Sequence, residues 1–363
     1  MNRADDTPRI DEWFRDNLRC PIDGGQLRWN DAKAGLISDA GRYYPVVDGV
    51  PVMLPEGVVP TLEGVQNSRA KIVGGAPWYL ESVFLSDLEK EGILRLVAKG
   101  DGIDPVAAYL VAATNGLGYA HLRGELKEYP IPELRLPPGQ GGVLLDIGCS
   151  WGRWCAAAAR KGYQVVGIDP SLGAVMAARR VMRALGLEAR FIVGDARHLP
   201  IRTGAIDTVF SYSVLQHFSV KDAKRTFDQV SRVLSPSGLC LVQMPTRYGL
   251  RCLYNQARRG FRETKGFEVR YWPVGDLLKA VGDRVGPAEI SVDCFFGIGW
   301  QPNDSHLMPP VFQGVIAVSE WLRRLSRSLT FLPWLSDSVY VLARKRPDQQ
   351  STGRSNPKRS PKS

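Results

Sequence analysis

The sequence has no apolar run that approaches the roughly 20 residues needed to cross a bilayer, so it predicts a chain that does not span a membrane. Its six cysteines include no C-x-x-C pair, and the first nineteen residues are too polar and charged for a secretory signal. These absences predict a reducing, cytoplasmic location. Internal repeats are absent as well. The 363 residues are enough for two or three domains with buried cores.

Basic residues exceed acidic residues by ten, but the excess is concentrated at the C-terminus. From Arg344 to Ser363, seven basic residues accompany one acidic residue, so this segment carries +6 of the net charge of +10. The rest of the chain lacks the concentrated positive field that binding to a phosphate backbone requires. Nucleic acid is therefore not the expected partner. The Ser, Pro and Gln content of residues 346–363 predicts a disordered basic tail.

The middle of the chain repeats a pattern of strand, turn and helix. Val143 to Ile147 is a short apolar run that ends in a Gly-rich turn, and Arg153 to Lys161 contains four consecutive alanines, typical of a helix packed closely on a sheet. The unit recurs at Gln164 to Ile168 and Ser171 to Leu185. Further predicted elements are strands at Ala189–Val193, Asp207–Ser211, Leu239–Met244, Glu289–Phe296 and Ser338–Ala343, and a helix at Lys221–Leu234. This alternation predicts an α/β fold with a Rossmann-like, doubly wound, mostly parallel seven-stranded sheet.

Composition and patterning divide the chain into five predicted segments. Helices are expected at Tyr79 to Ala98 and Pro105 to Ala113, before a Pro-rich connector. The segments are a small β-rich module (1–60), a helical lead-in and connector (61–140), a ligand-binding core (141–247), a helical substrate cap with closing strands (248–345) and the basic tail (346–363).

An apolar stripe at helical spacing runs through the predicted cap, at Val311, Val315, Val318, Leu322 and Leu325. Such a stripe predicts a helix that packs over the sheet as part of the core. The alternative is a lipid-facing cap, which would imply a lipid-linked or hydrophobic acceptor and a membrane surface as a partner of the C-terminal region.

The Gly-rich turn is the first candidate site. Gly148, Ser150 and Gly152 follow the first predicted parallel strand, at the edge where open α/β sheets bind ligands. A side chain at either glycine would keep a ligand away from the backbone. Asp169, at the end of the second strand, is placed to accept hydrogen bonds from ribose hydroxyls. These features fit nucleotide-like ligands and dinucleotides equally well.

The end of the third predicted strand distinguishes between nucleotide-like ligands and dinucleotides. Asp195, in Gly194-Asp195-Ala196, is placed to pair with an exocyclic amine beside the apolar residues Leu199 to Ile201. A dehydrogenase is disfavoured, because Arg153 breaks the G-x-G-x-x-G pattern. The ordered motifs resemble the class I S-adenosylmethionine-dependent methyltransferases over Gly142 to Pro245. Four blocks carry the resemblance: Leu145–Arg153, Gly167–Ser171, Gly194–Pro200 and Asp207–Phe218.

The resemblance implies S-adenosylmethionine as the cofactor and a role for each matching residue. Asp146, Gly148 and Gly152 would line the methionine portion, and Asp169 would hold the ribose. Ser150 replaces a family glycine, and its hydroxyl would reach the cofactor. The remaining implied contacts are Asp195 and Ala196 at the adenine, and Ser211 and Tyr212 beside the methyl-bearing sulfur. No metal is implied.

Methyl transfer depends mainly on aligning the acceptor, the methyl carbon and the sulfur in line. A general base is needed only when the acceptor must lose a proton. His217 follows the fourth predicted strand at the cleft and is the candidate base, with a cleft-lining or helix-capping role as the alternative. Tyr212 is the second catalytic candidate.

Two motifs in the first sixty residues resemble the small zinc-ribbon family of methyltransferase activator subunits. They are Cys20-Pro21-Ile22-Asp23 and the Y-P-x-x-D-G-x-P-x-x-L pattern that begins at Tyr44. Metal-binding members have cysteines where this chain has Asp23 and Ser38, and Cys20 alone cannot hold a tetrahedral zinc ion. We expect a metal-free ribbon that packs beside the catalytic domain or extends it.

These observations predict methyl transfer by in-line displacement to a small-molecule, glycan or lipid-intermediate acceptor. An RNA or protein methyltransferase is the enzymatic alternative, and it is favoured by the activator-like N-terminus. A non-catalytic nucleotide-binding scaffold is the other alternative, but the intact Asp146, Asp169 and Asp195 argue against it.

Overall fold

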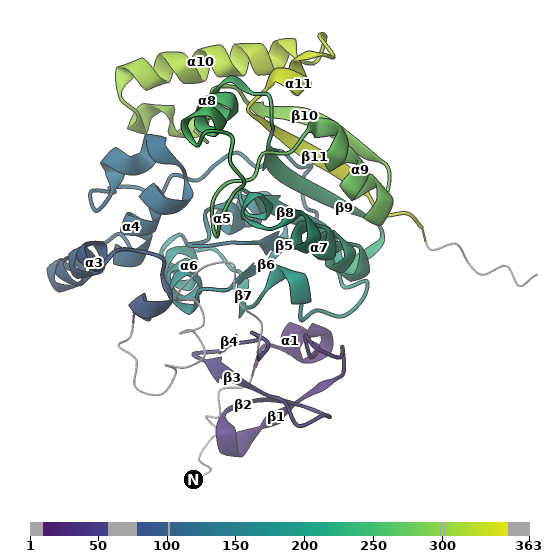
Figure 1. The fold of residues 1–363 in the computed structure, drawn as a ribbon. Coiled ribbons are helices and arrows are strands. Elements are labelled where there is room, and N and C mark those ends of the chain that lie inside the picture. Colours follow the sequence, from purple (N-terminus) through teal and green to yellow (C-terminus); the bar gives the residue numbers. More distant parts are fainter. Residues whose placement is uncertain (1–9, 57–77, 101, 298, 301, 348–363) are drawn as a thin grey trace, which may run out of the picture.

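The computed structural model describes residues 10–56, 78–100, 102–297, 299–300 and 302–347 (Figure 1). A seven-stranded sheet has the order β10-β11-β9-β8-β5-β6-β7. Its strands are β5 (Val143–Ile147), β6 (Gln164–Asp169), β7 (Arg190–Val193), β8 (Ile206–Tyr212), β9 (Leu234–Pro245), β10 (Ala288–Cys294) and β11 (Ser338–Arg344). Strands β5 to β9 pair in parallel, and β11 lies antiparallel to both β9 and β10. The predicted α/β fold is confirmed.

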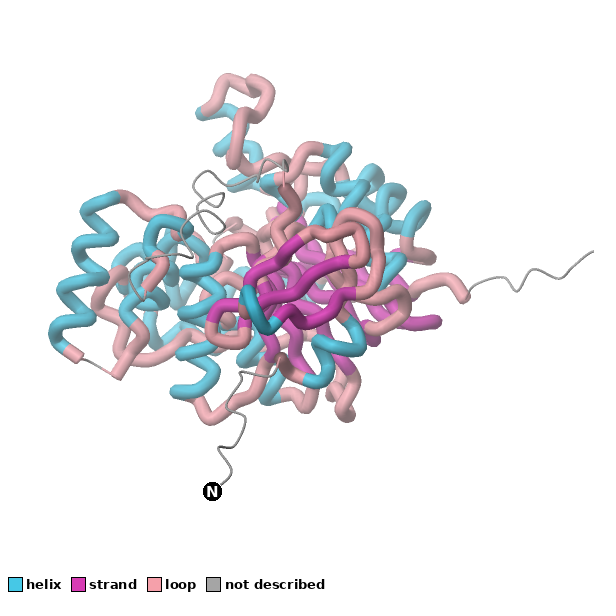
Figure 2. The backbone as a smooth tube through the Cα atoms, turned by 90° about the horizontal axis from the view of Figure 1, so that it is seen from below, coloured by secondary structure: helices cyan, strands magenta, loops and turns pink. Residues whose placement is uncertain are grey.

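Helices cover both faces of this sheet, as Figure 2 shows on either side of the strands. Side chains of α5 (Arg153–Arg160) and α6 (Leu172–Ala184) share one apolar core with Leu144 and Val165. Side chains of α7 (Val220–Val233) and α9 (Val274–Arg284) share another core with Ile147, Ile168 and Val242. Because successive strand residues point to opposite faces, β5 to β9 and β11 contribute side chains to both cores, whereas β10 packs only against the second.

The N-terminal residues form a separate four-stranded antiparallel sheet with one short helix. Its elements are α1 (Glu12–Asn17), β1 (Leu27–Asn30), β2 (Gly35–Ser38), β3 (Tyr43–Val47) and β4 (Val50–Pro51). Just after β4, Val52 bridges Val193 of β7, and the Met53 amide donates to the Val193 carbonyl at 2.7 Å. Leu18 and Ile201 form a second isolated backbone bridge, which is antiparallel. The small sheet therefore supplies backbone partners to an edge of the large one, which would otherwise expose unpaired amides and carbonyls.

Hydrogen bonds engage Cys20, Asp23 and Ser38, the three positions considered above as a degenerate metal site. The Cys20 thiol lies 3.2 Å from the Tyr44 hydroxyl, and the Ser38 hydroxyl accepts from the Arg42 amide at 3.1 Å. Asp23 pairs with Arg42 and accepts from the Gly25 amide, which lowers the pKa of its carboxyl. Within the described part of the chain, no cluster of three or more His, Cys, Asp or Glu side chains could hold a metal ion.

The first lead-in helix begins later than the sequence predicts, whereas the second begins at Pro105 as predicted. Helix α3 (Asp87–Lys99) starts after Ser86, whose hydroxyl accepts from the Glu89 amide while the Glu89 carboxylate accepts from the Ser86 amide. This capping box sets the start of the helix, so the prediction of a helix from Tyr79 is wrong. A short 3-10 turn, η2 (Leu80–Ser82), precedes it, and α4 (Pro105–Thr114) and η3 (Leu117–Leu122) follow.

The cap contains α8 (Leu250–Arg258), η6 (Pro302–Leu307), α10 (Pro310–Leu325) and α11 (Leu332–Leu335). The predicted packing of the apolar stripe is wrong for Val311 and Val318, which are 77% and 49% exposed. Helix α10 instead buries Ile316, which packs in an apolar core, and Ser319, whose hydroxyl accepts from the Phe295 amide at 3.0 Å. Among the described helices, none has the length and apolar character required to cross a bilayer. The predicted tail lies outside the described residues from position 348 onward.

We expect Leu18→Ala to lower the free energy of unfolding by about 2 to 5 kcal/mol, because Leu18 is 1% exposed where the two sheets meet. Chemical denaturation measures the change. Leu88→Ala is the matched control, since Leu88 is 71% exposed, and it should shift the value by less than about 0.5 kcal/mol. Equal effects of the two substitutions would show that the junction does not contribute to stability.

Candidate cofactor and acceptor site

A cavity of about 480 Å³ lies at the carboxyl ends of β5, β6 and β8. This volume is within the range of small-molecule sites, about 300 to 1,000 Å³. The loops after these strands form part of its wall, and α8 and residues 267–271 form another part. Seven residues that the sequence predicts for the site line it: Gly148, Ser150, Asp169, Asp195, Ala196, Tyr212 and His217.

The turn after β5 brings bare backbone to the cavity. Gly148 has φ +75°, and a Cβ atom there would overlap the side chain of Val214. Ser150 has φ +46°, in the left-handed region that favours glycine, although it is not a glycine. Its amide donates to the carboxylate of Asp169 at 3.0 Å, which stabilises the turn.

Asp169 joins two loops at the end of β6. One carboxylate oxygen accepts from the Ser150 amide, and the other accepts from the Ser171 amide at 2.9 Å. Burial raises the pKa of this carboxyl to about 6, although the two amide hydrogen bonds act in the opposite direction. Each oxygen has a further lone pair, so the carboxylate can accept two more hydrogen bonds from a ligand in the cavity.

Asp195 is already engaged in an ion pair. Its carboxylate accepts from the Arg197 amide at 2.8 Å and from the Arg197 guanidinium at 2.6 and 2.9 Å. This pairing raises the pKa of Arg197. Ala196 follows and begins η4 (Ala196–His198). An exocyclic amine would therefore share the Asp195 carboxylate with a guanidinium, a partner that the sequence motif does not indicate.

Three predicted site residues do not line the cavity. Asp146 is buried behind the turn and accepts from the Cys155 thiol at 3.2 Å, and burial raises its pKa to about 7. At Gly152, a Cβ atom would come within 3.0 Å of the Ala178 Cβ, so this glycine lets α5 approach α6. The Ser211 hydroxyl donates to the Ile147 carbonyl at 3.1 Å, inside the sheet. All three support the cavity wall from outside.

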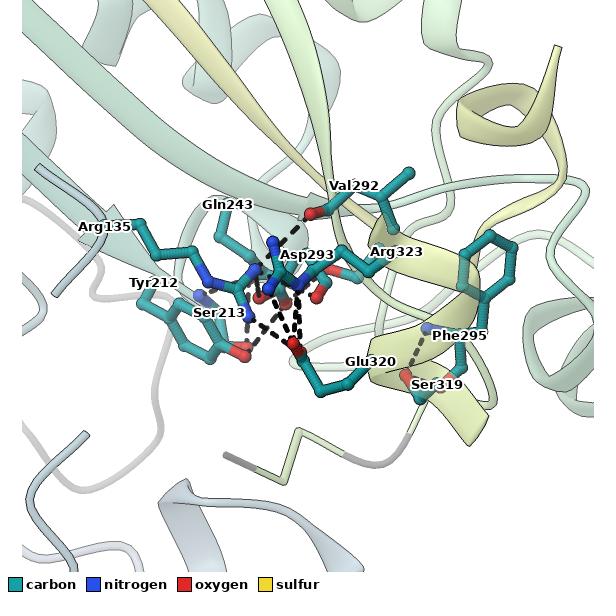
Figure 3. A network of polar contacts seen from close by, with 11 residues as sticks. Arg135, Tyr212, Ser213, Gln243, Val292, Asp293, Phe295, Ser319, Glu320 and Arg323 are labelled. Carbon is teal, nitrogen blue, oxygen red and sulfur yellow. Dashed lines mark hydrogen bonds and ion pairs between the residues drawn. The ribbon is translucent and has the colours of Figure 1, made fainter. Parts of the chain in front are cut away.

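Tyr212 belongs to a network of polar contacts, shown in Figure 3. Its hydroxyl donates to the Asp293 carboxylate at 3.0 Å, which also accepts from Ser338 at 3.0 Å and from Arg135 at 3.3 Å. Arg135 contacts Glu320 of α10 as well, at 3.3 Å, so the network connects the cap to the cavity wall. Burial holds the pKa of Tyr212 well above its ordinary value, and the side chain is a neutral hydrogen-bond donor.

His217, in η5 (Leu215–His217), is held by Phe267. The two rings stack with centroids 3.8 Å apart, and the imidazole Nδ1 lies 2.7 Å from the Phe267 carbonyl oxygen. A carbonyl only accepts, so Nδ1 carries the proton of the neutral ring. Burial lowers the pKa of His217 to about 4, far below the near-neutral value that suits a general base.

Residues outside the four sequence blocks form the rest of the wall. Phe84, Phe267 and Tyr271 are aromatic, and Phe84 and Phe267 have ring centroids 5.9 Å apart. Arg251 and Asn255 line the cavity from α8. No motif or periodicity in the sequence identifies these residues, because they converge on the cavity from separate elements.

Three buried donors belong to lining residues and have no hydrogen-bond partner among the residues that the structure describes. They are Asn115 Nδ2, Trp151 Nε1 and Arg153 Nε. The other end of the Arg153 guanidinium pairs with Asp304 at 3.1 Å. Donors of this kind suit an anionic group such as a carboxylate, whereas Asp169 suits hydroxyl groups. The donor and acceptor set therefore fits a nucleoside that carries an amino-acid carboxylate.

Comparison with known proteins identifies the two parts of the chain separately. Residues 144–238 match the family described as Methyltransferase domain. Norajmaline N-methyltransferase of Rauvolfia serpentina is 36% identical over 96 residues, which are 26% of this chain and 32% of that protein. A UPF0434 protein of Methylobacterium sp. (strain 4-46) is 41% identical over 64 residues, 16% of this chain and 97% of that protein. The chain thus matches about a third of the length of this methyltransferase relative.

A solved structure with a similar fold is geranyl diphosphate C-methyltransferase from Streptomyces coelicolor A3(2), in a complex that contains S-adenosyl-L-homocysteine. It is 19% identical to this chain and has a TM-score of 0.40. The likeness covers 58% of this chain and 71% of that one.

We expect Asp169→Ala to weaken the binding of S-adenosylmethionine about tenfold to a hundredfold, because a charged acceptor for hydroxyl groups is lost. Isothermal titration calorimetry measures the affinity. Asp207→Ala is the control, since its carboxylate accepts from the Val143 amide at the opposite end of β5. Unchanged affinity in Asp169→Ala would contradict the ribose assignment.

The same assignment predicts a pH dependence. With a pKa of about 6, the Asp169 carboxyl is ionised at pH 7 and about nine-tenths protonated at pH 5. Protonation removes acceptor capacity, so the affinity should fall about tenfold between these values. Asp169→Asn should remove this part of the dependence, and an unaltered profile in that variant would assign it to another group.

The match to the methyltransferase family lies on β5 to β9, the strands whose ends build the cavity. The UPF0434 match covers 16% of this chain and supports the N-terminal segment that contains the small sheet. The two matches agree with the two sheets that the structure separates. The chain carries a class I S-adenosylmethionine-dependent methyltransferase domain and belongs, through its N-terminal residues, to the UPF0434 family.

Proposed function

We propose that the protein transfers the methyl group of S-adenosylmethionine to an apolar organic acceptor, a small molecule or a lipid intermediate. One observation carries the proposal. A single cavity contains both the motif residues Gly148 and Asp169 and the aromatic residues Phe84, Phe267 and Tyr271. A cofactor at one part of this cavity and an acceptor at the other would therefore be in contact, as direct transfer requires.

The bound cofactor would supply a methyl group on a sulfonium, which is a good leaving group. The residues of this chain would bind and align the reactants and exclude water. Asp169 would hold the ribose hydroxyls, and the unpartnered donors of Asn115 and Arg153 would serve the carboxylate. Trp154 and Tyr212, with ring centroids 4.7 Å apart, contribute aromatic surface to the cavity wall.

The charges of the cavity favour an acceptor without phosphate groups. Arg153 and Arg251 are the cations among the described lining residues, and Arg153 is paired with Asp304. Asp195 and Asp293 are paired with Arg197 and Arg135, which leaves Arg251 as the one described lining cation without a carboxylate partner. An RNA acceptor would meet no basic channel here, which argues against that alternative.

We infer that neither catalytic candidate acts as a general base. The Tyr212 hydroxyl is committed to Asp293, and the low pKa of His217 makes its imidazole a weak base. Both rings would then position the reactants. This arrangement suits an acceptor atom that is nucleophilic without losing a proton in the same step.

The direct test is incubation of the purified protein with a cell extract and methyl-labelled S-adenosylmethionine. We expect label in the fraction that dissolves in organic solvent, and loss of that label with Asp169→Ala. Label in RNA or protein would overturn the proposed acceptor class. Heat of cofactor binding without label in any fraction would support the non-catalytic scaffold.

Substitutions at the two candidates test the positioning roles. Once the acceptor is isolated, Tyr212→Phe and His217→Asn should each lower kcat by less than about tenfold, because removing a general base costs about a hundredfold or more. Tyr212→Ala is the companion variant, and its larger loss would reflect removal of the ring. A hundredfold loss in Tyr212→Phe or His217→Asn would identify that residue as the base.

A further inference from the structure

The outer surface of the cap exposes large apolar side chains. We call it the cap surface and define it by Leu250, Leu253 and Tyr254 on α8, Val318 and Trp321 on α10, and Trp334 on α11. Leu250 is 69% exposed and Trp321 is 62% exposed. Figure 1 shows these three helices at one end of the molecule, away from the N-terminal sheet. Several exposed aromatic and aliphatic side chains on neighbouring elements indicate an interaction surface, whereas single ones do not.

Helix α8 separates this surface from the cavity. Arg251, Cys252 and Asn255 line the cavity, whereas Leu253 and Tyr254 on the same helix are exposed. The helix therefore has one side on the acceptor part of the cavity and an apolar side toward solvent. An acceptor at the cap surface would have to pass only this helix or its flanking loops to reach the cavity.

Arginines accompany the apolar side chains. The guanidinium groups of Arg251 and Arg258 lie 5.6 and 5.8 Å from the Tyr254 ring centroid. Within the described part of the chain, no carboxylate forms an ion pair with Arg251, Arg258, Arg324 or Arg327. Exposed aromatic and aliphatic residues with unpaired arginines around them are the pattern of helices that lie in the interface of an anionic bilayer.

We propose that the cap surface docks on an anionic lipid bilayer and that the methyl acceptor is a molecule dissolved in that bilayer. The second part rests on the proposed methyl transfer, whereas the docking does not. A second copy of the chain is a poorer occupant, because a two-fold contact would bring the same unpaired arginines together. The basic side chains instead complement a negatively charged surface, and their alkyl stems can lie along its apolar layer.

Co-sedimentation with lipid vesicles tests the docking. The full-length protein is mixed with vesicles of phosphatidylglycerol and phosphatidylcholine, or of phosphatidylcholine alone. We expect binding to the mixed vesicles to be at least tenfold stronger, and to weaken as salt is raised, because each basic residue near the surface adds electrostatic attraction. Equal binding to both kinds of vesicle, or no binding to either, would overturn the proposal.

Two double variants locate the contact. Leu253→Ser with Trp321→Ser removes apolar contact, and Arg258→Glu with Arg324→Glu reverses charge. Each should lower vesicle binding at least tenfold. The controls are Leu88→Ser with Leu94→Ser on α3, which are 71% and 49% exposed, and Arg28→Glu in the N-terminal sheet; these should bind vesicles like the unaltered protein. Equal losses in the controls and the cap variants would overturn the assignment to this surface.

Further measurements distinguish a failure of the proposed docking from a failure of the proposed methyl transfer. Calorimetric titration with S-adenosylmethionine should give the same affinity in all of these variants, because none of the altered residues lines the cavity. Vesicle binding without cofactor binding would support the docking and contradict the proposed methyl transfer. Sedimentation analysis without lipid should give one species, and a dimer that Leu253→Ser with Trp321→Ser abolishes would overturn the lipid assignment.

Discussion

The site depends on one partly buried carboxylate. Asp169 accepts a hydrogen bond from the amide of Ser150 in the turn after β5 and another from the amide of Ser171 at the start of α6. These two loops belong to adjacent parallel strands, and the carboxylate holds them at a fixed separation. Burial makes the charged form of Asp169 costly, and amide donors offset part of that cost. The geometry of the cofactor part of the cavity follows from this arrangement.

A second polar arrangement connects the cap to the same cavity. Asp293 of β10 gathers Tyr212, Ser338 and Arg135, and Arg135 extends to Glu320 of α10. Because these polar groups satisfy one another, they leave the acceptor part of the cavity with aromatic and aliphatic surface. In this way a wall that contains several charged side chains would favour the apolar acceptor that we propose.

The two ends of the molecule serve different purposes. At one end, the N-terminal sheet pairs its backbone with β7 and protects an edge of the large sheet. Cys20 and Ser38 make hydrogen bonds within this module, and its apolar side chains share a core with those of the large sheet. At the other end, α8, α10 and α11 leave apolar and basic side chains exposed. A docked lipid surface would therefore not compete with the N-terminal module for space.

The sequence by itself determined the order of strands and helices, the Gly148 turn and the position of Asp169, because these follow from local patterns within a few residues. Only the tertiary structure decided which distant residues reach the cavity: Asn115, Asp293 and the lining residues of α8 share no motif with the core. It also decided which side of α10 packs. Val311 and Val318 form part of an apolar stripe, yet both are exposed, whereas Ile316 and Ser319 of the same helix are buried and the Ser319 hydroxyl accepts from the Phe295 amide. Periodicity identifies an apolar helix face, but the partner that a face meets depends on contacts between residues far apart in the chain.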